Sequence, residues 1–197
     1  MTKFLRLEDV VEAYHGTKIE NKEKILNKSF NISNTPDHIP NDLGNGIYFF
    51  LDKGSNYKNP KEMAESFVKN YRNCLDDEYI IFKVTVSDEA KLIDYNDPEN
   101  AACFEKFRDK NLNTILKHYD RFVYTSQART SSIPGSLKRA NLDGIVFELL
   151  KNKAKYDGVV KDTYTPQNKK YNKSSFSNGR ELCLYECDNI VDIKEAT

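Results

Sequence analysis

The chain has 197 residues, of which 39% are hydrophobic and 30% charged, and its formal net charge is zero. This length suits one domain with a core that needs neither disulfides nor metal, and the composition is that of a globular protein. The four cysteines and three histidines show no zinc-ligand spacing, so we expect no metal site. We therefore expect one domain over residues 1–197.

The charge is unevenly distributed along the chain. Met1–Glu105 contains 13 Lys and Arg against 19 Asp and Glu, whereas Lys106–Thr197 contains 17 against 11. Lys151–Lys173 alone has seven lysines and two aspartates. A basic segment of this kind can face phosphates, although an ordinary solvated loop has the same composition.

The N-terminal segment and the hydropathy favour a cytoplasmic setting. Met1–Val11 mixes charged with apolar side chains, which argues against a secretory signal. No apolar stretch approaches the length of a membrane span, and the cysteines show no disulfide framework. We expect a cytoplasmic location and no membrane partner.

In the first half of the chain, short apolar runs alternate with polar segments. The patterns predict a short helix or entry segment at Phe4–Ala13, a strand at Ala13–His15, a helix from Asn21, a loop at Ser33–Gly44, a strand at Gly46–Leu51 and a helix opened by Asn59-Pro60.

The second half contains the strongest strand pattern, Glu78–Val86, which is rich in β-branched residues. The remaining patterns predict strands at Leu92–Tyr95, Asp143–Phe147, Tyr156–Val160, Glu181–Tyr185 and Ile190–Ile193, helices at Asn100–Tyr119 and Leu137–Leu142, and a long polar loop at Lys161–Gly179. Helices and strands without regular βαβ alternation indicate an α+β fold.

Three separated segments each place a polar or aromatic residue beside an apolar, strand-like run. They are Tyr14-His15-Gly16-Thr17, Gly44-Asn45-Gly46-Ile47-Tyr48-Phe49 and Arg180-Glu181-Leu182-Cys183-Leu184-Tyr185. Taken alone, His15, Tyr48 and Glu181 are each explained more simply as structural residues. Together they offer a ribose-hydroxyl partner, an aromatic clamp and a carboxylate, which are the groups that cleavage of a nicotinamide–ribose bond requires.

In this order the segments resemble the His-Tyr-Glu class of ADP-ribosyltransferases, the group of diphtheria toxin and the poly(ADP-ribose) polymerases. Tyr79–Val86 and Leu137–Phe147 resemble parts of its bacterial and phage members. The resemblance implies an ADP-ribosyltransferase-like split β-sandwich of two small sheets with flanking helices.

The resemblance also implies the roles of the site residues. The co-substrate would be NAD+, with no metal. His15 and Thr17 would contribute to NAD binding, Gly16 would meet the carboxamide with its backbone, and Tyr48 would pack on the nicotinamide side. Glu181 would be catalytic, holding the 2′-hydroxyl and stabilising the oxocarbenium ion. Tyr57 is the nearest match to a second ring-stacking tyrosine, with Phe67 or Tyr71 as substitutes.

The acceptor is expected to meet the loop at about 161–180. Six of its side chains are candidates for that contact: Lys169, Lys170, Tyr171, Lys173, Phe176 and Arg180. Lysines interleaved with aromatics suit a nucleic acid, and a protein acceptor remains an alternative. Gly179, where related arginine-modifying classes carry a second glutamate, disfavours arginine as the acceptor.

The sequence thus predicts a mono-ADP-ribosyltransferase, a transferase acting on a macromolecule. The resemblance suggests a bacterial toxin of a toxin–antitoxin or phage-defence system, with an antitoxin as a neutralising partner. Two alternatives stay open: an NAD glycohydrolase that uses water as acceptor, and a non-catalytic module that binds NAD or ADP-ribose.

Overall fold

The computed structural model describes residues 4–5, 11–32, 40–54, 57–129, 142–166, 174 and 176–196. Its strands are β1 (Phe4–Leu5), β2 (Val11–Lys18), β3 (Ile47–Leu51), β4 (Tyr79–Val86), β5 (Leu92–Asp94), β6 (Gly158–Thr163), β7 (Gly179–Leu184) and β8 (Ile190–Glu195). Its helices are the 3₁₀ turn η1 (Ile19–Asn21), α1 (Lys22–Lys28), α2 (Pro60–Tyr71), α3 (Pro98–Lys110), α4 (Leu112–Arg129) and α6 (Leu142–Ala154).

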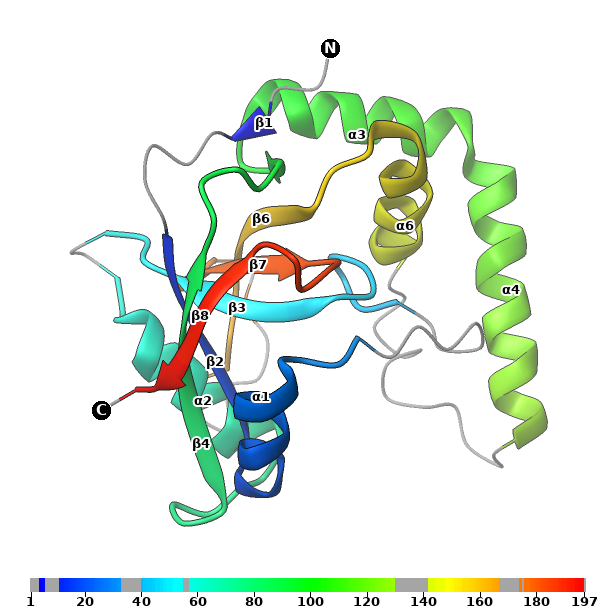
Figure 1. Cartoon of the computed structure of the whole chain (residues 1–197). Coiled ribbons are helices and arrows are strands. Elements are labelled where there is room, and N and C mark those ends of the chain that lie inside the picture. The colour runs from blue at the N-terminus through cyan, green and yellow to red at the C-terminus, as the bar shows by residue number, and fades with distance from the viewer. Residues whose placement is uncertain are drawn as a thin grey trace.

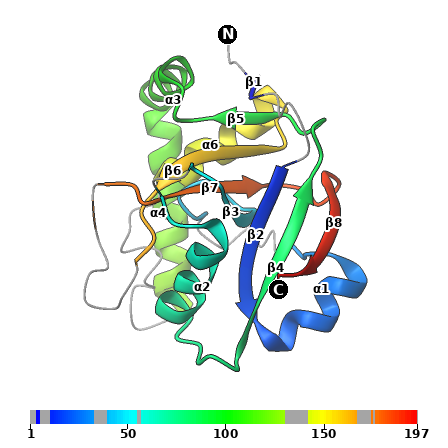
Figure 2. The same cartoon turned by 90° about the vertical axis from the view of Figure 1, so that its left-hand side faces the viewer.

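The described strands form one hydrogen-bonded sheet in the order β1-β5-β6-β7-β3-β2-β4-β8. Neighbours are antiparallel except β5 and β6, which are parallel. The sheet is strongly bent, because β2, β4 and β8 run across the direction of β3, β6 and β7 (Figures 1 and 2). Side chains from both halves meet in one apolar cluster, which includes Phe82 and Val84 of β4 together with Phe49 and Leu182.

The bend occurs where β2 meets β3. These two strands pair at only two positions, Ala13 with Leu51 and Tyr14 with Phe50, whereas β2 and β4 pair along the whole of β2. Beyond Tyr14 the pairing of β2 with β3 stops. The β2–β3 ladder therefore ends next to His15, while β2 continues to pair with β4.

Helices cover the two halves of the sheet separately. Helix α2 packs on β2, β3 and β4 through Met63, Ala64 and Val68. Helices α3, α4 and α6 lie together beside the β5-β6-β7 part of the sheet (Figure 1) and share a second core with Ile93, Val159 and Cys183. The core is thus divided into three clusters around the bend.

The α+β class predicted from the sequence is confirmed. The finer expectation of two separate small sheets is not confirmed, because the described strands join into one sheet. The strand at 79–86 and the helix opened by Asn59-Pro60 are confirmed. The Asn59 side chain caps that helix by accepting a hydrogen bond from the Lys61 amide at 2.8 Å.

Three local predictions were wrong. Residues 143–147 lie in helix α6, and a helix buried on several sides gives the same short apolar run as a buried strand. The helix expected at Asn100–Tyr119 is two helices that meet at Asn111. The start of the chain, where a short helix or an entry segment was expected, contributes strands at Phe4–Leu5 and from Val11.

Candidate active site

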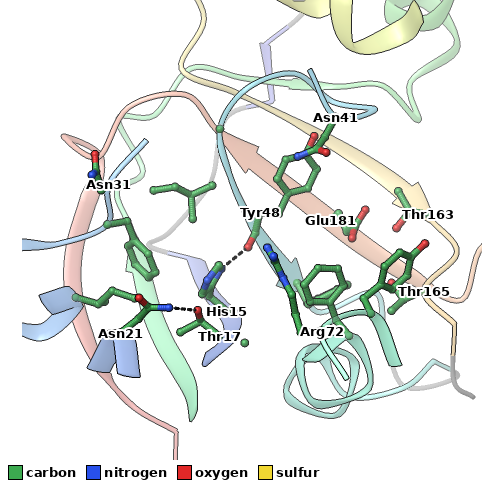
Figure 3. Close-up of a pocket in the computed structure, with 18 of the residues that line it drawn as sticks. His15, Thr17, Asn21, Asn31, Asn41, Tyr48, Arg72, Thr163, Thr165 and Glu181 are labelled. Atoms are coloured by element: carbon green, nitrogen blue, oxygen red, sulfur yellow. Dashed lines mark hydrogen bonds between the residues drawn. The ribbon is translucent and has the colours of Figure 1, made fainter. Parts of the chain in front are cut away.

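A cavity of about 740 Å³ opens beside the point where β2 and β3 separate (Figure 3). A volume of this size is typical of small-molecule and cofactor sites. The residues around it come from β2, α1 and the turn after it, β3 and the segment before it, the end of α2, the end of β6, and β7. They are His15, Gly16, Thr17, Asn21, Lys24, Ile25, Ser29, Phe30, Asn31, Asn41, Asp42, Gly46, Ile47, Tyr48, Phe50, Phe67, Tyr71, Arg72, Thr163, Tyr164, Thr165 and Glu181.

His15 fills the gap left by the interrupted strand pairing. Its Nδ1 lies 2.8 Å from the backbone oxygen of Tyr48, and its ring makes edge contacts with Phe30 and Phe49 at centroid distances of 5.0 and 5.7 Å. A carbonyl oxygen can only accept a hydrogen bond, so Nδ1 carries the proton and donates it. The other nitrogen, Nε2, is then an acceptor, and no described residue donates a hydrogen bond to it.

The surroundings of His15 keep its imidazole neutral. Burial lowers the pKa of His15 to about 4, and the positive charge of Arg72 acts in the same direction, against the hydrogen bond to Tyr48. At neutral pH the ring is therefore an uncharged hydrogen-bond acceptor on the cavity wall. It is suited to hold a hydroxyl group of a ligand and not to act as a cation.

Gly16 and Thr17 follow His15 in β2 and have different neighbours. A Cβ atom on Gly16 would lie 2.6 Å from the backbone oxygen of Ala64, so this position needs glycine for α2 to pack against the strand. Thr17 lies one residue further on, and its hydroxyl oxygen accepts a hydrogen bond from the Asn21 side chain at 3.1 Å. Both residues line the cavity, and Gly16 also allows the close packing of α2.

Tyr48 lies in the cavity wall with its phenol held by the preceding turn. The hydroxyl donates to the backbone oxygen of Gly44 at 3.0 Å and accepts from the Leu43 amide at 2.9 Å. Gly44 adopts a φ of 100°, a conformation that favours glycine. Burial raises the pKa of Tyr48 well above its usual value, so the phenol stays neutral. Its ring is thus presented in a fixed orientation.

Glu181 is the third residue of β7 and pairs with Phe50 of β3 on one side and Lys161 of β6 on the other. Figure 3 shows its carboxylate at the cavity, near Thr163 and on the far side of Arg72 from His15. The sequence predicted Glu181 at the start of this strand, and the structure places it two residues inside. Its backbone is therefore held by ladders on both sides.

Thr163 lies at the same edge of the cavity as Glu181. Among the described residues, its Oγ1 is the one buried side-chain oxygen or nitrogen without a hydrogen-bond partner. A buried hydroxyl left unsatisfied costs about 1–3 kcal/mol. A water molecule or a polar ligand group that reached it would recover this cost.

The aromatic wall of the cavity comes from α2. The rings of Phe67 and Tyr71 are stacked, with centroids 5.2 Å apart and an interplanar angle of 24°, and both line the cavity. Tyr57 does not line it. That ring is 46% exposed and lies under the Lys53 ammonium at 4.1 Å. Phe67 and Tyr71, the substitutes named from the sequence, thus line the cavity, whereas Tyr57 lies outside its lining.

Two cations of the cavity, Lys24 and Arg72, were not identified from the sequence. Arg72 follows the last residue of α2, and its guanidinium lies 5.9 Å from the centre of the Phe67 ring. Neither cation forms an ion pair with a described residue. The only local signal for Arg72 was its place directly after the apolar face of α2 that ends at Tyr71, and such a place is also typical of a surface arginine.

The segment expected to meet the acceptor is described only in part. Lys169, Lys170, Tyr171 and Lys173 lie outside the described residues. Phe176 is 84% exposed, as a residue that meets a partner would be.

Arg180, the last candidate of that segment, is occupied elsewhere. Its Nε lies 2.8 Å from Asp162 Oδ1, and Lys53 Nζ lies 3.1 Å from Asp162 Oδ2. We call Lys53, Asp162 and Arg180 the ion cluster. It joins the ends of β6 and β7 to the residues after β3.

Other kinds of chemistry find little support in the part of the chain that the structure describes. No group of three or more His, Cys, Asp or Glu side chains there is placed to hold a metal ion. Cys183 is fully buried, and burial raises the pKa of its thiol well above the usual value, so it is not a nucleophile. No described helix has the length and apolar character needed to cross a membrane.

Comparison with known protein families, curated sequences and solved structures found no match to this chain. The evidence on function therefore comes from the cavity itself. Three residues from distant segments, His15, Tyr48 and Glu181, line one cavity. That wall combines a neutral imidazole, fixed and stacked aromatic rings, and one glutamate, a set suited to a ligand with flat rings and sugar hydroxyls.

Proposed function

We propose that the protein is a mono-ADP-ribosyltransferase that moves ADP-ribose from NAD+ to a macromolecular acceptor. The observation that carries the proposal is that His15, Tyr48 and Glu181, which are far apart in the sequence, line the same cavity. The resemblance of their segments to the His-Tyr-Glu class predicts that these three residues share one site.

In the proposed reaction, the bond between the ribose C1′ and the nicotinamide nitrogen breaks, and its electron pair neutralises the pyridinium ring. The ribose then carries oxocarbenium character, which the Glu181 carboxylate stabilises through the 2′-hydroxyl. A nucleophilic oxygen or nitrogen of the acceptor bonds to C1′ and loses its proton to solvent. No oxidant, reductant or metal is needed.

The wall of the cavity supports each part of this proposal. Phe67, Tyr71 and Tyr48 offer flat apolar surface for the nicotinamide, and the neutral His15 offers an acceptor for a ribose hydroxyl. The bent sheet also supports a split-sandwich architecture, because its two halves share an apolar cluster across the break beside His15. We include that finer fold in the proposal.

The test uses purified protein, NAD+ labelled in its adenylate portion, and whole-cell extract, with nuclease and protease applied to parallel samples. Label should become attached to macromolecules in the wild type and be lost in Glu181→Gln. Glu186→Gln is the matched control, because Glu186 is exposed and follows the same strand. Label that disappears with nuclease identifies a nucleic acid acceptor, and label that disappears with protease identifies a protein.

Two other outcomes would overturn the proposal. Rapid release of free nicotinamide without any transferred label would make the protein an NAD glycohydrolase. Binding of NAD+ with neither label transfer nor nicotinamide release would make it a binding module.

The proposed biological role is that of a bacterial toxin with an antitoxin as partner. It is supported by the resemblance to bacterial and phage members alone. Induced expression of the wild type should halt bacterial growth, and Glu181→Gln at the same protein level should not. Equal growth of both cultures would remove the toxin role while leaving the enzymatic proposal intact.

A further inference from the structure

Arg72 lines the cavity and brings a positive charge to it. Figure 3 shows the Arg72 side chain reaching into the space between His15 and Glu181. Its positive charge also contributes to the low pKa of His15, which agrees with a guanidinium directed toward that ring. Arg72 thus lies between the two groups assigned to ribose hydroxyls.

The charge of Arg72 is not neutralised by any described carboxylate. This distinguishes it from the nearby ion cluster, in which Asp162 pairs with both Lys53 and Arg180. The Arg72 guanidinium lies instead near the face of Phe67, at 5.9 Å from the ring centre, which leaves its N–H groups available. A guanidinium in this state is well suited to bind an anionic group of a ligand.

The donor molecule has one anionic part. NAD+ consists of two ribose units joined by a pyrophosphate, so a dinucleotide with one ribose at Glu181 and the other at His15 places the pyrophosphate between them. Resting on the proposed function, we propose that Arg72 binds the pyrophosphate of the dinucleotide and thereby selects dinucleotide donors over phosphate-free nicotinamide ribosides. Lys24 of α1 also lines the cavity and forms no ion pair with a described residue.

The experiment measures binding with and without the pyrophosphate. Calorimetric titrations of the wild type, Arg72→Gln, Arg72→Lys and Arg108→Gln use ADP-ribose as the pyrophosphate ligand and nicotinamide riboside as the phosphate-free ligand. Loss of a charge-assisted hydrogen bond should weaken ADP-ribose binding roughly 10- to 100-fold in Arg72→Gln. Binding of nicotinamide riboside should change less than about twofold, and Arg72→Lys should recover part of the loss.

Arg108→Gln makes the same chemical change on α3, outside the cavity lining, and should bind both ligands like the wild type. Melting temperatures of all four proteins show whether a loss reflects folding, and Arg72→Lys takes over the comparison where Arg72→Gln is unfolded. Salt gives an independent measurement, since raising ionic strength should weaken ADP-ribose binding to the wild type more than to Arg72→Gln.

The results separate this inference from the proposed function. Equal weakening of both ligands in Arg72→Gln, or no weakening of either, would overturn the role of Arg72 while NAD+ cleavage by the wild type still stood. A wild type that binds neither ADP-ribose nor NAD+ would overturn the proposed function, and the inference with it.

Discussion

Arg180 and Glu181 are adjacent in β7, yet they belong to two different regions of the molecule. Successive side chains of a strand point to opposite faces of the sheet, so Arg180 enters the ion cluster while Glu181 lines the cavity. In the ion cluster, the single carboxylate of Asp162 contacts both Lys53 and Arg180. In the cavity, Arg72 and Lys24 have no such partner among the described residues.

The comparison separates charges that pair within the fold from charges that line the cavity. Burial by itself raises the pKa of Asp162, but the hydrogen bonds from Arg180 and Lys53 outweigh it, and the pKa lies below its usual value. The two cations thus favour the ionised form of Asp162. The cavity lining has two exposed cations, Lys24 and Arg72, and we expect an anionic group of a bound ligand to pair with Arg72.

The largest expected effect is on catalysis, and it distinguishes the adjacent β7 residues Glu181 and Arg180. Glu181→Gln should reduce NAD+ turnover by roughly 10²- to 10³-fold, because it removes a charge that acts on the transition state, and should leave the melting temperature unchanged. Arg180→Gln should lower the melting temperature and keep the rate of nicotinamide release per folded molecule. Steady-state kinetics and thermal unfolding of both variants make the comparison, and a reversal of the two results would contradict the division of roles.

The next effect concerns the half-buried imidazole of His15. Because the folded pKa of His15 is about 4 and the unfolded value is 6.5, only the unfolded state gains a proton in this window, so stability falls with falling pH. The expected loss is about 3 kcal/mol between pH 6.5 and 4. Urea unfolding at several pH values should show this loss in the free energy of unfolding in the wild type and in the control His118→Gln. The loss should be much smaller in His15→Gln. An unchanged pH dependence in His15→Gln would contradict the burial of a neutral ring.

A smaller effect is expected in the ion cluster. Asp162→Asn leaves Lys53 with a side chain only 8% exposed and no carboxylate beside it. Since Asp162 and Arg180 are partly solvated, we expect a loss of about 2 kcal/mol in the free energy of unfolding. Asp192→Asn breaks an exposed pair with Lys194 and should cost about 0.5 kcal/mol or less. Equal losses in chemical denaturation would show that the cluster has no special role.

The smallest effect distinguishes the two candidate tyrosines. Replacement of Tyr71 by Leu should raise the KM for NAD+ roughly 2- to 10-fold, the range of one lost aromatic contact. Tyr57→Leu should leave the KM unchanged, because that ring contacts Lys53 outside the cavity lining. A larger effect at Tyr57 than at Tyr71 would return Tyr57 to the role that the sequence resemblance gave it.

Local patterns were sufficient to predict much of the secondary structure. The β-branched run at Tyr79–Val86 and the capped start of α2 at Asn59 carry their own signals. Residues 143–147 carry an ambiguous one, because a short apolar run has no period that separates a buried strand from a buried helix. That choice was made by packing: a Cβ atom on Gly144 would lie 1.8 Å from the backbone oxygen of Asn41, so the helix there lies directly against another segment.

The sequence by itself determined the residue types from which a site could be built, since His15, Tyr48 and Glu181 stand out in their segments. The tertiary structure decided which side chains share a cavity. In β7, Glu181 lines the cavity while Arg180 belongs to the ion cluster. Tyr71 lines the cavity, whereas Tyr57 lies under Lys53. Arg72 lines the cavity as well. The physical reason is that strand alternation and helix packing fix the direction of each side chain, and contacts between distant segments depend on the whole bent sheet.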